Sequence, residues 1–205
     1  MILRNYYWWF DSVIPSRVCD EIIKYGTSKD SKLAITGDFN DIKKLTEKDE
    51  NKLKRHRNSQ VSFLSEPWIF KEIYPYITVA NQNAGWNFEL SNTESCQFTK
   101  YGLDQHYGWH CDSWKTPYKE PPWRKGLIRK LSMTLCLNDA TEYEGGELEF
   151  DFKDKTKTDP IVCEQIKKKG SIIVFPSFVW HRVKPVTKGT RYSLVAWNLG
   201  NPFKN

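Results

Sequence analysis

The stretch HYGWHCDSW, from His106 to Trp114, places two histidines, one aspartate and three aromatic rings within nine residues. His110 and Asp112 are two positions apart, and on a β-strand such residues project from the same face. An imidazole nitrogen and a carboxylate oxygen side by side can bind one cation. Because the His-x-Asp pattern is frequent by chance, an ordinary hydrogen-bonded strand end is the alternative at this point.

A third ligand would have to come from the other histidines, since the chain has four in all. His56 lies in a charged segment, His106 adjoins the pair, and His181 follows the apolar run FPSFVW. A charged imidazole is costly in apolar surroundings, so His181 is either a satisfied core histidine or a residue with a partner. Added to His110 and Asp112, it completes the two-histidine, one-carboxylate set typical of non-haem Fe(II).

Arg191 is the only charged residue in the predicted strand 190–198, TRYSLVAWN. A buried arginine needs an anion, and its planar fork fits a carboxylate. Residues 176–205 contain no acidic residue, so the anion belongs to another part of the fold or to a ligand. A dicarboxylate could bind a metal ion with one end and Arg191 with the other. An ion pair with a neighbouring strand is the alternative.

Composition and length predict one soluble domain over residues 1–205, because typical domains have about 100–200 residues. The five cysteines are odd in number and form no Cys-x-x-Cys pair, so we expect free thiols in a reducing compartment. Neither a signal peptide nor a long apolar segment is present, which favours a cytoplasmic protein without membrane contact. The net charge of +6 fits an acidic small molecule, an anionic partner or simple solubility, and no long basic run indicates nucleic-acid binding.

The element pattern predicts a mainly β (α+β) fold. Ser16 and Gly26 are expected to cap and stop a first helix, residues 60–64 to form a strand, and residues 66–85 to form a helix kinked at Pro75. The charged segment 27–57 should lie entirely on the surface. Eight short strands follow, over 95–101, 106–112, 130–138, 146–152, 161–167, 171–176, 179–186 and 190–198. This order predicts a jelly roll over 95–198 behind an N-terminal helical support over 1–94.

Taken together, these motifs resemble the 2-oxoglutarate- and Fe(II)-dependent oxygenase superfamily, in its prolyl-4-hydroxylase-like branch. The resemblance is carried by QFTKYGLDQHYGWHCD (97–112), RKLSMTLCLND (129–139), GGELEF (145–150), KKGSIIVFPSFVWHRVKPVTKGTRYSLVAW (168–197) and, more weakly, VIPSRVCDEIIKYG (13–26). Collagen-type members usually carry lysine where this chain has Arg191. That difference suggests a bacterial- or phage-like subgroup and weakens any transfer of the collagen substrate.

The resemblance implies a double-stranded β-helix and a set of site residues with three roles. The Fe(II) ligands would be His110, Asp112 and His181. The 2-oxoglutarate contacts would be Arg191, Tyr101 and Ser193. The substrate contacts would be Tyr107, Trp114 and Trp197. The family also suggests ascorbate as a further cofactor.

The implied reaction hydroxylates a peptidyl side chain, prolyl first, and converts 2-oxoglutarate to succinate and carbon dioxide. The partner would be a protein or peptide. A free amino acid or other small molecule is the alternative substrate, and a non-catalytic metal-binding jelly roll is the alternative class. Nucleic-acid demethylation is disfavoured, because that branch expects a second arginine where this chain has Trp197. The proline-rich loop 113–128 either covers the site or is a solvated connection.

Overall fold

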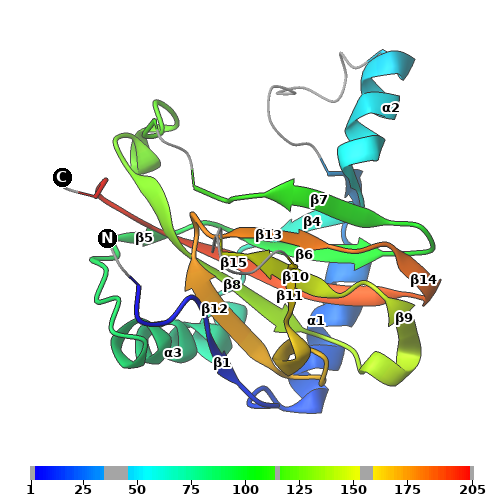
Figure 1. The fold of residues 1–205 in the computed structure, drawn as a ribbon, viewed down its shortest axis with the longest axis horizontal. Coiled ribbons are helices and arrows are strands. Elements are labelled where there is room, and N and C mark those ends of the chain that lie inside the picture. The colour runs from blue at the N-terminus through cyan, green and yellow to red at the C-terminus, as the bar shows by residue number, and fades with distance from the viewer. Residues whose placement is uncertain (1–2, 35–45, 114–115, 153–158, 204–205) are drawn as a thin grey trace.

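Two antiparallel sheets packed face to face form the body of the protein in the computed structural model, which describes residues 3–34, 46–113, 116–152 and 159–203 (Figure 1). The main sheet has the order β1 (Trp8–Phe10), β12 (Ile172–Pro176), β8 (Ile128–Cys136), β15 (Arg191–Gly200), β6 (Cys96–Tyr101), β4 (Gln60–Leu64) and β2 (Lys32–Leu33), with β5 (Asn92–Thr93) paired to β15. The second sheet has the order β11 (Ile161–Val162), β10 (Leu148–Asp151), β13 (Trp180–Val183), β7 (His106–His110) and β3 (Arg57–Asn58). A small third sheet pairs β9 (Tyr143–Gly145) with β14 (Val186–Gly189). The predicted mainly β jelly roll is confirmed.

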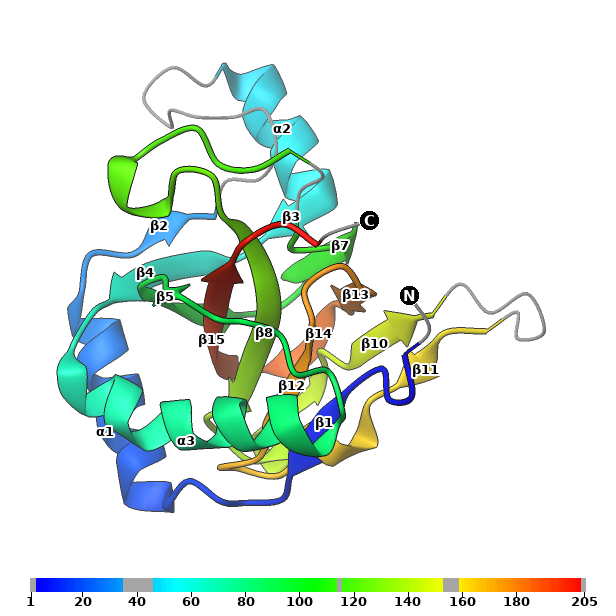
Figure 2. The same ribbon diagram turned by 90° about the vertical axis from the view of Figure 1, so that its left-hand side faces the viewer.

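Helices cover the outer face of the main sheet. Figure 2 shows α1 (Ser16–Ser28) and α3 (Pro67–Asn83) along this face, while α2 (Glu47–His56) stands away from the sheets above β3 and β7. Short 3-10 helices in the described residues lie at Pro122–Arg124, Ala140–Glu142 and Glu164–Ile166. Within the described residues, no helix combines the length and apolar character needed to cross a bilayer.

Strand β8 separates the two interiors of the molecule. Leu131, Met133 and Leu135 point to the helices and join the larger apolar core. The alternate residues Ser132 and Thr134 are also buried, at 0% and 7% exposure, so both faces of the strand are covered. The predicted alternation is therefore correct, and its polar half faces the space between the two sheets, where the site lies.

The first helix differs from the expectation at both ends. Pro15 occupies the N-cap position of α1, so Ser16 is the first helical residue and does not cap the helix. The helix continues past Gly26, which is buried because it lies against the ring of Phe98 on β6. Close packing of helix on sheet, rather than helix termination, explains this glycine. The second predicted helix forms as α3 and includes Pro75 within its span.

The charged segment 27–57 is not entirely on the surface, as the composition had suggested. Among its described residues, Ala34, Leu53 and Arg57 are buried, with exposures of 1%, 2% and 5%. Residues 35–45 of this segment lie outside the described residues. The segment ends in β3, which pairs with β7 and so joins the second sheet. A part of the chain expected to be solvated therefore supports the site, because Arg57 packs on Tyr107.

We expect Gly26→Ala to destabilise the protein although alanine favours helix by about 1 kcal/mol. An added Cβ would overlap the Phe98 ring carbons, and overpacking of this kind typically costs about 1–3 kcal/mol. Urea denaturation followed by circular dichroism measures the change. Lys24→Ala, at an exposed position of the same helix, is the control and should change stability by less than about 0.5 kcal/mol. Equal stability of the two variants would contradict the packing argument.

Candidate active site

Three side chains from two adjacent strands converge between the sheets. His110 is the last residue of β7, His181 lies directly opposite it on β13, and Asp112 follows two residues after His110. The Nε2 atoms of His110 and His181 are each 3.6 Å from one oxygen of Asp112, Oδ1 and Oδ2 respectively. One ligand atom from each of the three residues lies within 4.8 Å of the others. The predicted His110, Asp112 and His181 are thus brought together.

Asp112 is positioned by a turn and not, as expected, by the strand that carries His110. Strand β7 ends at His110, so Asp112 is not on the strand and the pleat does not align the two side chains. Instead, the Asp112 backbone N–H donates to the carbonyl of Ser177 at 2.8 Å. The Ser132 hydroxyl donates to Asp112 Oδ2 at 2.7 Å and lies 2.9 Å from the Ser177 hydroxyl. These contacts hold the carboxylate toward the two imidazoles.

Both imidazoles are oriented by backbone carbonyls. His110 Nδ1 lies 2.8 Å from the Gly108 carbonyl, and His181 Nδ1 lies 2.9 Å from the Val179 carbonyl. A carbonyl oxygen only accepts, so each Nδ1 carries the proton and each Nε2 presents its lone pair toward Asp112. Hydrogen bonding of the second ring nitrogen is the usual way in which proteins orient metal-binding histidines.

The electrostatics keep the group in the protonation states that a cation requires. Burial and the neighbouring His181 lower the pKa of His110 well below 6.5. Burial acts to raise the pKa of Asp112, but His181, His110 and Arg129 outweigh it and lower that pKa to about 2. At neutral pH the site therefore offers a neutral His110 imidazole and an ionised carboxylate. Two imidazole nitrogens and one carboxylate fit a divalent first-row metal with open coordination positions.

The predicted 2-oxoglutarate contacts lie in the same cavity. Arg191, Tyr101 and Ser193 line it together with the three residues described above. Arg191 is 2% exposed, donates from Nη1 to the Ser193 hydroxyl at 3.3 Å, and lies 5.5 Å from the centre of the Tyr101 ring. Among the described residues no carboxylate lies within ion-pair distance of it. The described residues therefore do not support an ion pair between Arg191 and an acidic residue of a neighbouring strand. The guanidinium is available to a ligand.

Two of the three predicted substrate contacts also line the cavity. The Tyr107 ring stacks on the His110 imidazole with centroids 3.5 Å apart and an interplanar angle of 13°. Trp197 is 6% exposed, and its Nε1 is buried without a hydrogen-bond partner. Trp114 lies outside the described residues. Tyr107 and Trp197 therefore form aromatic walls beside the three candidate ligands.

Arg57, on β3, is a residue of the site that the sequence did not indicate. Its guanidinium lies 4.3 Å from the centre of the Tyr107 ring, on a side chain that also stacks on His110. Nε donates to the Ser59 hydroxyl at 3.1 Å, whereas Nη2 is buried without a hydrogen-bond partner. Composition alone had assigned Arg57 to a solvated segment, and only its pairing with β7 reveals its position.

A half-buried arginine, Arg129, supports Trp197. Arg129 lies 3.8 Å from the centre of the Trp197 ring, and its Nη2 donates to Glu94 Oε2 at 2.6 Å. The alternation in RKLSMTLCLND carried a signal for Ser132, which lies between apolar residues of β8. It gave none for Arg129, which has the same parity as Leu131 and Met133 and lies where the register between β8 and β15 shifts.

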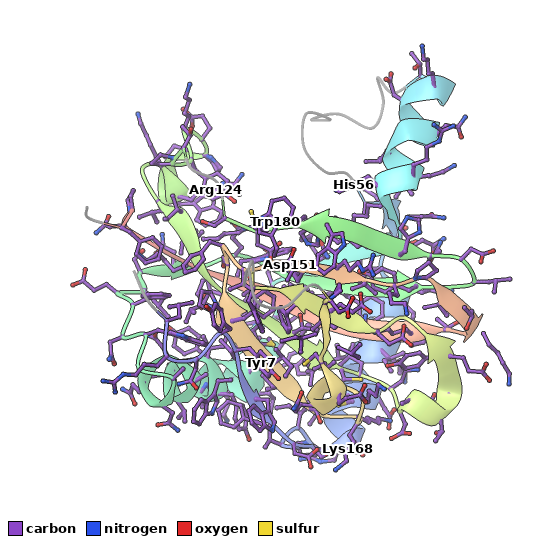
Figure 3. All side chains as sticks on the ribbon, viewed as in Figure 1. Tyr7, His56, Arg124, Asp151, Lys168 and Trp180 are labelled. Carbon is purple, nitrogen blue, oxygen red and sulfur yellow. The ribbon has the colours of Figure 1, made fainter. Side chains whose placement is uncertain are left out.

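Two projections flank the open side of the cavity. Figure 3 shows Arg124, on the segment 116–127, and His56, at the end of α2, on either side of Trp180. Arg124 lies over the Tyr118 ring at 4.2 Å, and the His56 ring meets Tyr107 edge to face. Both segments therefore lie on the same side of the molecule as Trp180, which adjoins His181 on β13.

Comparisons with known proteins agree with this geometry. The family model described as "2OG-Fe(II) oxygenase superfamily" matches residues 96–198, half of the chain, and the chain belongs to that superfamily. The superfamily uses Fe(II) and 2-oxoglutarate, so these two predicted cofactors are confirmed at the level of the family.

The individual proteins that this chain resembles are hydroxylases. A PKHD-type hydroxylase of Synechococcus sp. (strain CC9902) is 38% identical over 108 residues, which are 53% of this chain and 42% of that protein, so the match spans less than half of the relative. The fold is similar to a viral collagen prolyl hydroxylase from Paramecium Bursaria Chlorella virus-1, with a TM-score of 0.65, 20% identity and coverage of 96% and 97% of the two chains. The fold is also similar to that of a Pseudomonas putida prolyl-4-hydroxylase, with a TM-score of 0.64 and 19% sequence identity. The match covers 95% of this chain and 92% of that one.

The lowered pKa of His110 has a consequence for stability in the metal-free protein. Below pH 6.5 the unfolded chain binds a proton at this residue that the folded protein does not bind. Stability should therefore fall as the pH decreases below 6.5, by up to about 1.4 kcal/mol per pH unit from this group. His110→Gln should remove that contribution, which urea denaturation at a series of pH values measures. Identical slopes for the variant and the unchanged protein would contradict this interpretation.

Proposed function

We propose that this chain is a 2-oxoglutarate- and Fe(II)-dependent dioxygenase that hydroxylates a peptidyl side chain, with prolyl as the first candidate. The observation that carries the proposal is one cavity lined by both the His110, Asp112 and His181 group and the unpaired Arg191 guanidinium. The first group suits a divalent metal and the second suits a carboxylate, and both line the same cavity.

In this proposal His110, Asp112 and His181 hold Fe(II), and Arg191, Tyr101 and Ser193 hold 2-oxoglutarate. When bound, the two cofactors supply the oxidation, in which one oxygen atom of dioxygen enters a substrate C–H bond and the other enters succinate as carbon dioxide leaves. The chain itself contributes position and exclusion of water. Ser132 fixes the carboxylate of Asp112, and the rings of Tyr107 and Trp197 shield the reacting position.

A peptide is favoured over a small compact molecule by two donors at the site. Among the described residues, Trp197 Nε1, in the wall of the cavity, and Arg57 Nη2, on a side chain packed against Tyr107, are buried donors without hydrogen-bond partners. An unsatisfied buried donor typically costs about 1–3 kcal/mol, which an incoming acceptor recovers. Backbone carbonyl oxygens of an extended peptide are acceptors of this kind. Tyr107, Trp197 and the undescribed Trp114 are proposed as the aromatic contacts of the side chain that reacts.

Two further features of the proposal concern the surroundings of the enzyme. All five cysteines are free, which supports a reducing compartment and, with it, a cytoplasmic location. Ascorbate is proposed as a reductant that keeps the iron in the Fe(II) state. The dependence of turnover number on added ascorbate tests this second point directly.

Anaerobic loading with Fe(II) and 2-oxoglutarate, followed by exposure to air with a peptide library, tests the activity. We expect a 2-oxoglutarate-dependent absorption band, succinate, and a peptide that has gained one oxygen atom. Arg191→Met should raise the KM for 2-oxoglutarate roughly 100-fold, because it removes one member of a buried charged pair. Lys188→Met, at an exposed ion pair with Glu144, is the control. No band and no succinate would indicate a non-catalytic jelly roll, whereas turnover with free amino acids alone would favour a small-molecule hydroxylase.

Arg57→Met should raise the KM for the peptide at least tenfold and leave the KM for 2-oxoglutarate unchanged. The reason is that the variant keeps an apolar contact with Tyr107 but removes the unpartnered donor. Arg55→Met, at an exposed position two residues earlier, is the matched control. A parallel rise in both KM values would show that Arg57 only supports the shape of the site.

A further inference from the structure

A second cavity lies behind Arg191, and no step of the proposed reaction uses it. Its volume is about 150 Å³, and its lining residues include Ala140, Tyr143, Glu147, Lys167 and Arg191. We call it the outer cavity. It shares only Arg191 and Leu148 with the inner cavity that contains the three candidate metal ligands. These two side chains therefore separate the cavities.

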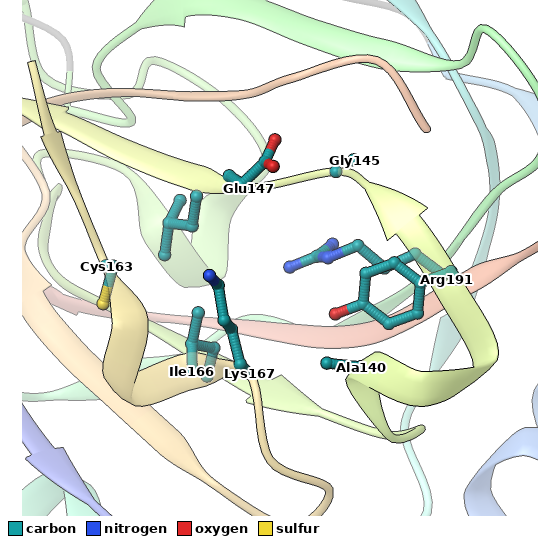
Figure 4. A pocket seen from close by; sticks show the side chains of 10 residues that line it. Ala140, Gly145, Glu147, Cys163, Ile166, Lys167 and Arg191 are labelled. Atoms are coloured by element: carbon teal, nitrogen blue, oxygen red, sulfur yellow. The ribbon is translucent and has the colours of Figure 1, made fainter. Parts of the chain in front are cut away.

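The outer cavity has a cationic centre. Figure 4 shows the Arg191 guanidinium and the Lys167 ammonium extending toward the same space from different walls. Burial raises the pKa of Tyr143 and of Cys163 to about 12, so both lining groups remain neutral. Glu147 is the carboxylate among the lining residues; its Oε2 lies 3.7 Å from Lys184 Nζ and has no hydrogen-bond partner among the described residues, so the two cations face one anion and the lining keeps an excess positive charge.

No carboxylate among the described residues balances the positive charge of Arg191. Lys167 forms an ion pair with Glu164 at 2.5 Å, but this carboxylate is 64% exposed, and such surface pairs are weak. Arg191 is 2% exposed, and the acceptors that it meets among the described side chains are neutral, the hydroxyl of Ser193 and the phenol of Tyr143. A guanidinium has five donors in a planar fork, so its two edges can bind two different acceptors. A buried cation of this kind favours an anion on either side.

We propose that the outer cavity binds a small oxyanion between Arg191 and Lys167, and that this anion weakens the binding of 2-oxoglutarate. The ligand chemistry is that of inorganic phosphate or of the carboxylate of a short organic acid. The binding itself does not depend on catalysis. The coupling rests on the proposed function, since both anions would share the single positive charge of Arg191, and such coupling is reciprocal.

Calorimetric titration of the metal-free protein tests the binding. We expect saturable binding of inorganic phosphate, or of acetate in a parallel titration at the same ionic strength, and the tighter of the two identifies the ligand class. Lys167→Ala should weaken this binding about three- to tenfold, and Ala140→Leu should abolish it by filling the cavity. Lys168→Ala is the control, because Lys168 pairs with Asp11 outside the cavity, and it should bind like the unchanged protein.

Thermal denaturation shows that each variant is folded before it is titrated. Absence of saturable binding for both anions in the unchanged protein would overturn the proposal. Unchanged binding in Ala140→Leu would also overturn it, because the anion would then lie outside the outer cavity.

Repeating the titration with protein loaded anaerobically with Fe(II), at increasing concentrations of 2-oxoglutarate, tests the coupling. Two separate sites predict that the apparent Kd of the small anion rises about fivefold or more and then reaches a plateau. A rise in proportion to 2-oxoglutarate without limit would place the anion in the inner cavity and overturn the proposal. Anion binding that persists in a chain that fails to bind 2-oxoglutarate would sink the proposed function while leaving the outer site in place.

Discussion

The antiparallel register between β7 and β13 is the constraint on which the site depends. It sets His181 opposite His110, which no separation along the chain could ensure. Asp112 completes the group because its backbone is tied to Ser177, in the turn that precedes β13. One pair of strands and the turns at their ends therefore position all three candidate ligands, and the remaining contacts orient them.

Strand β8 links this site to the folding core. Its apolar residues pack on α1 and α3, while its small polar residues face the space between the sheets. Ser132 illustrates the consequence, since a hydroxyl on the second face of a core strand binds Asp112. The helical layer thus stabilises the sheet that carries the site without contributing a ligand. A substitution in that layer can alter the site only by moving the strand.

The buried positive charge of Arg191 is the second feature that organises the cavity. Burying an ion is costly unless it is paired, and no described carboxylate is in range. Ser193 and Tyr101 orient the guanidinium without neutralising it. An unbalanced buried cation favours an anion beside it, and Arg191 lines two cavities from which an anion could reach it.

The sequence by itself determined the jelly roll, through the period of its short strands, and it indicated His110, Asp112, His181 and Arg191, because these residue types are costly in an apolar interior without a partner. Only the tertiary structure decided the rest. Arg57 lies in a segment whose composition predicts exposure, yet pairing of β3 with β7 buries it against Tyr107. Contacts of this kind join distant parts of the chain, and their pairing depends on shape and register, which local composition does not encode.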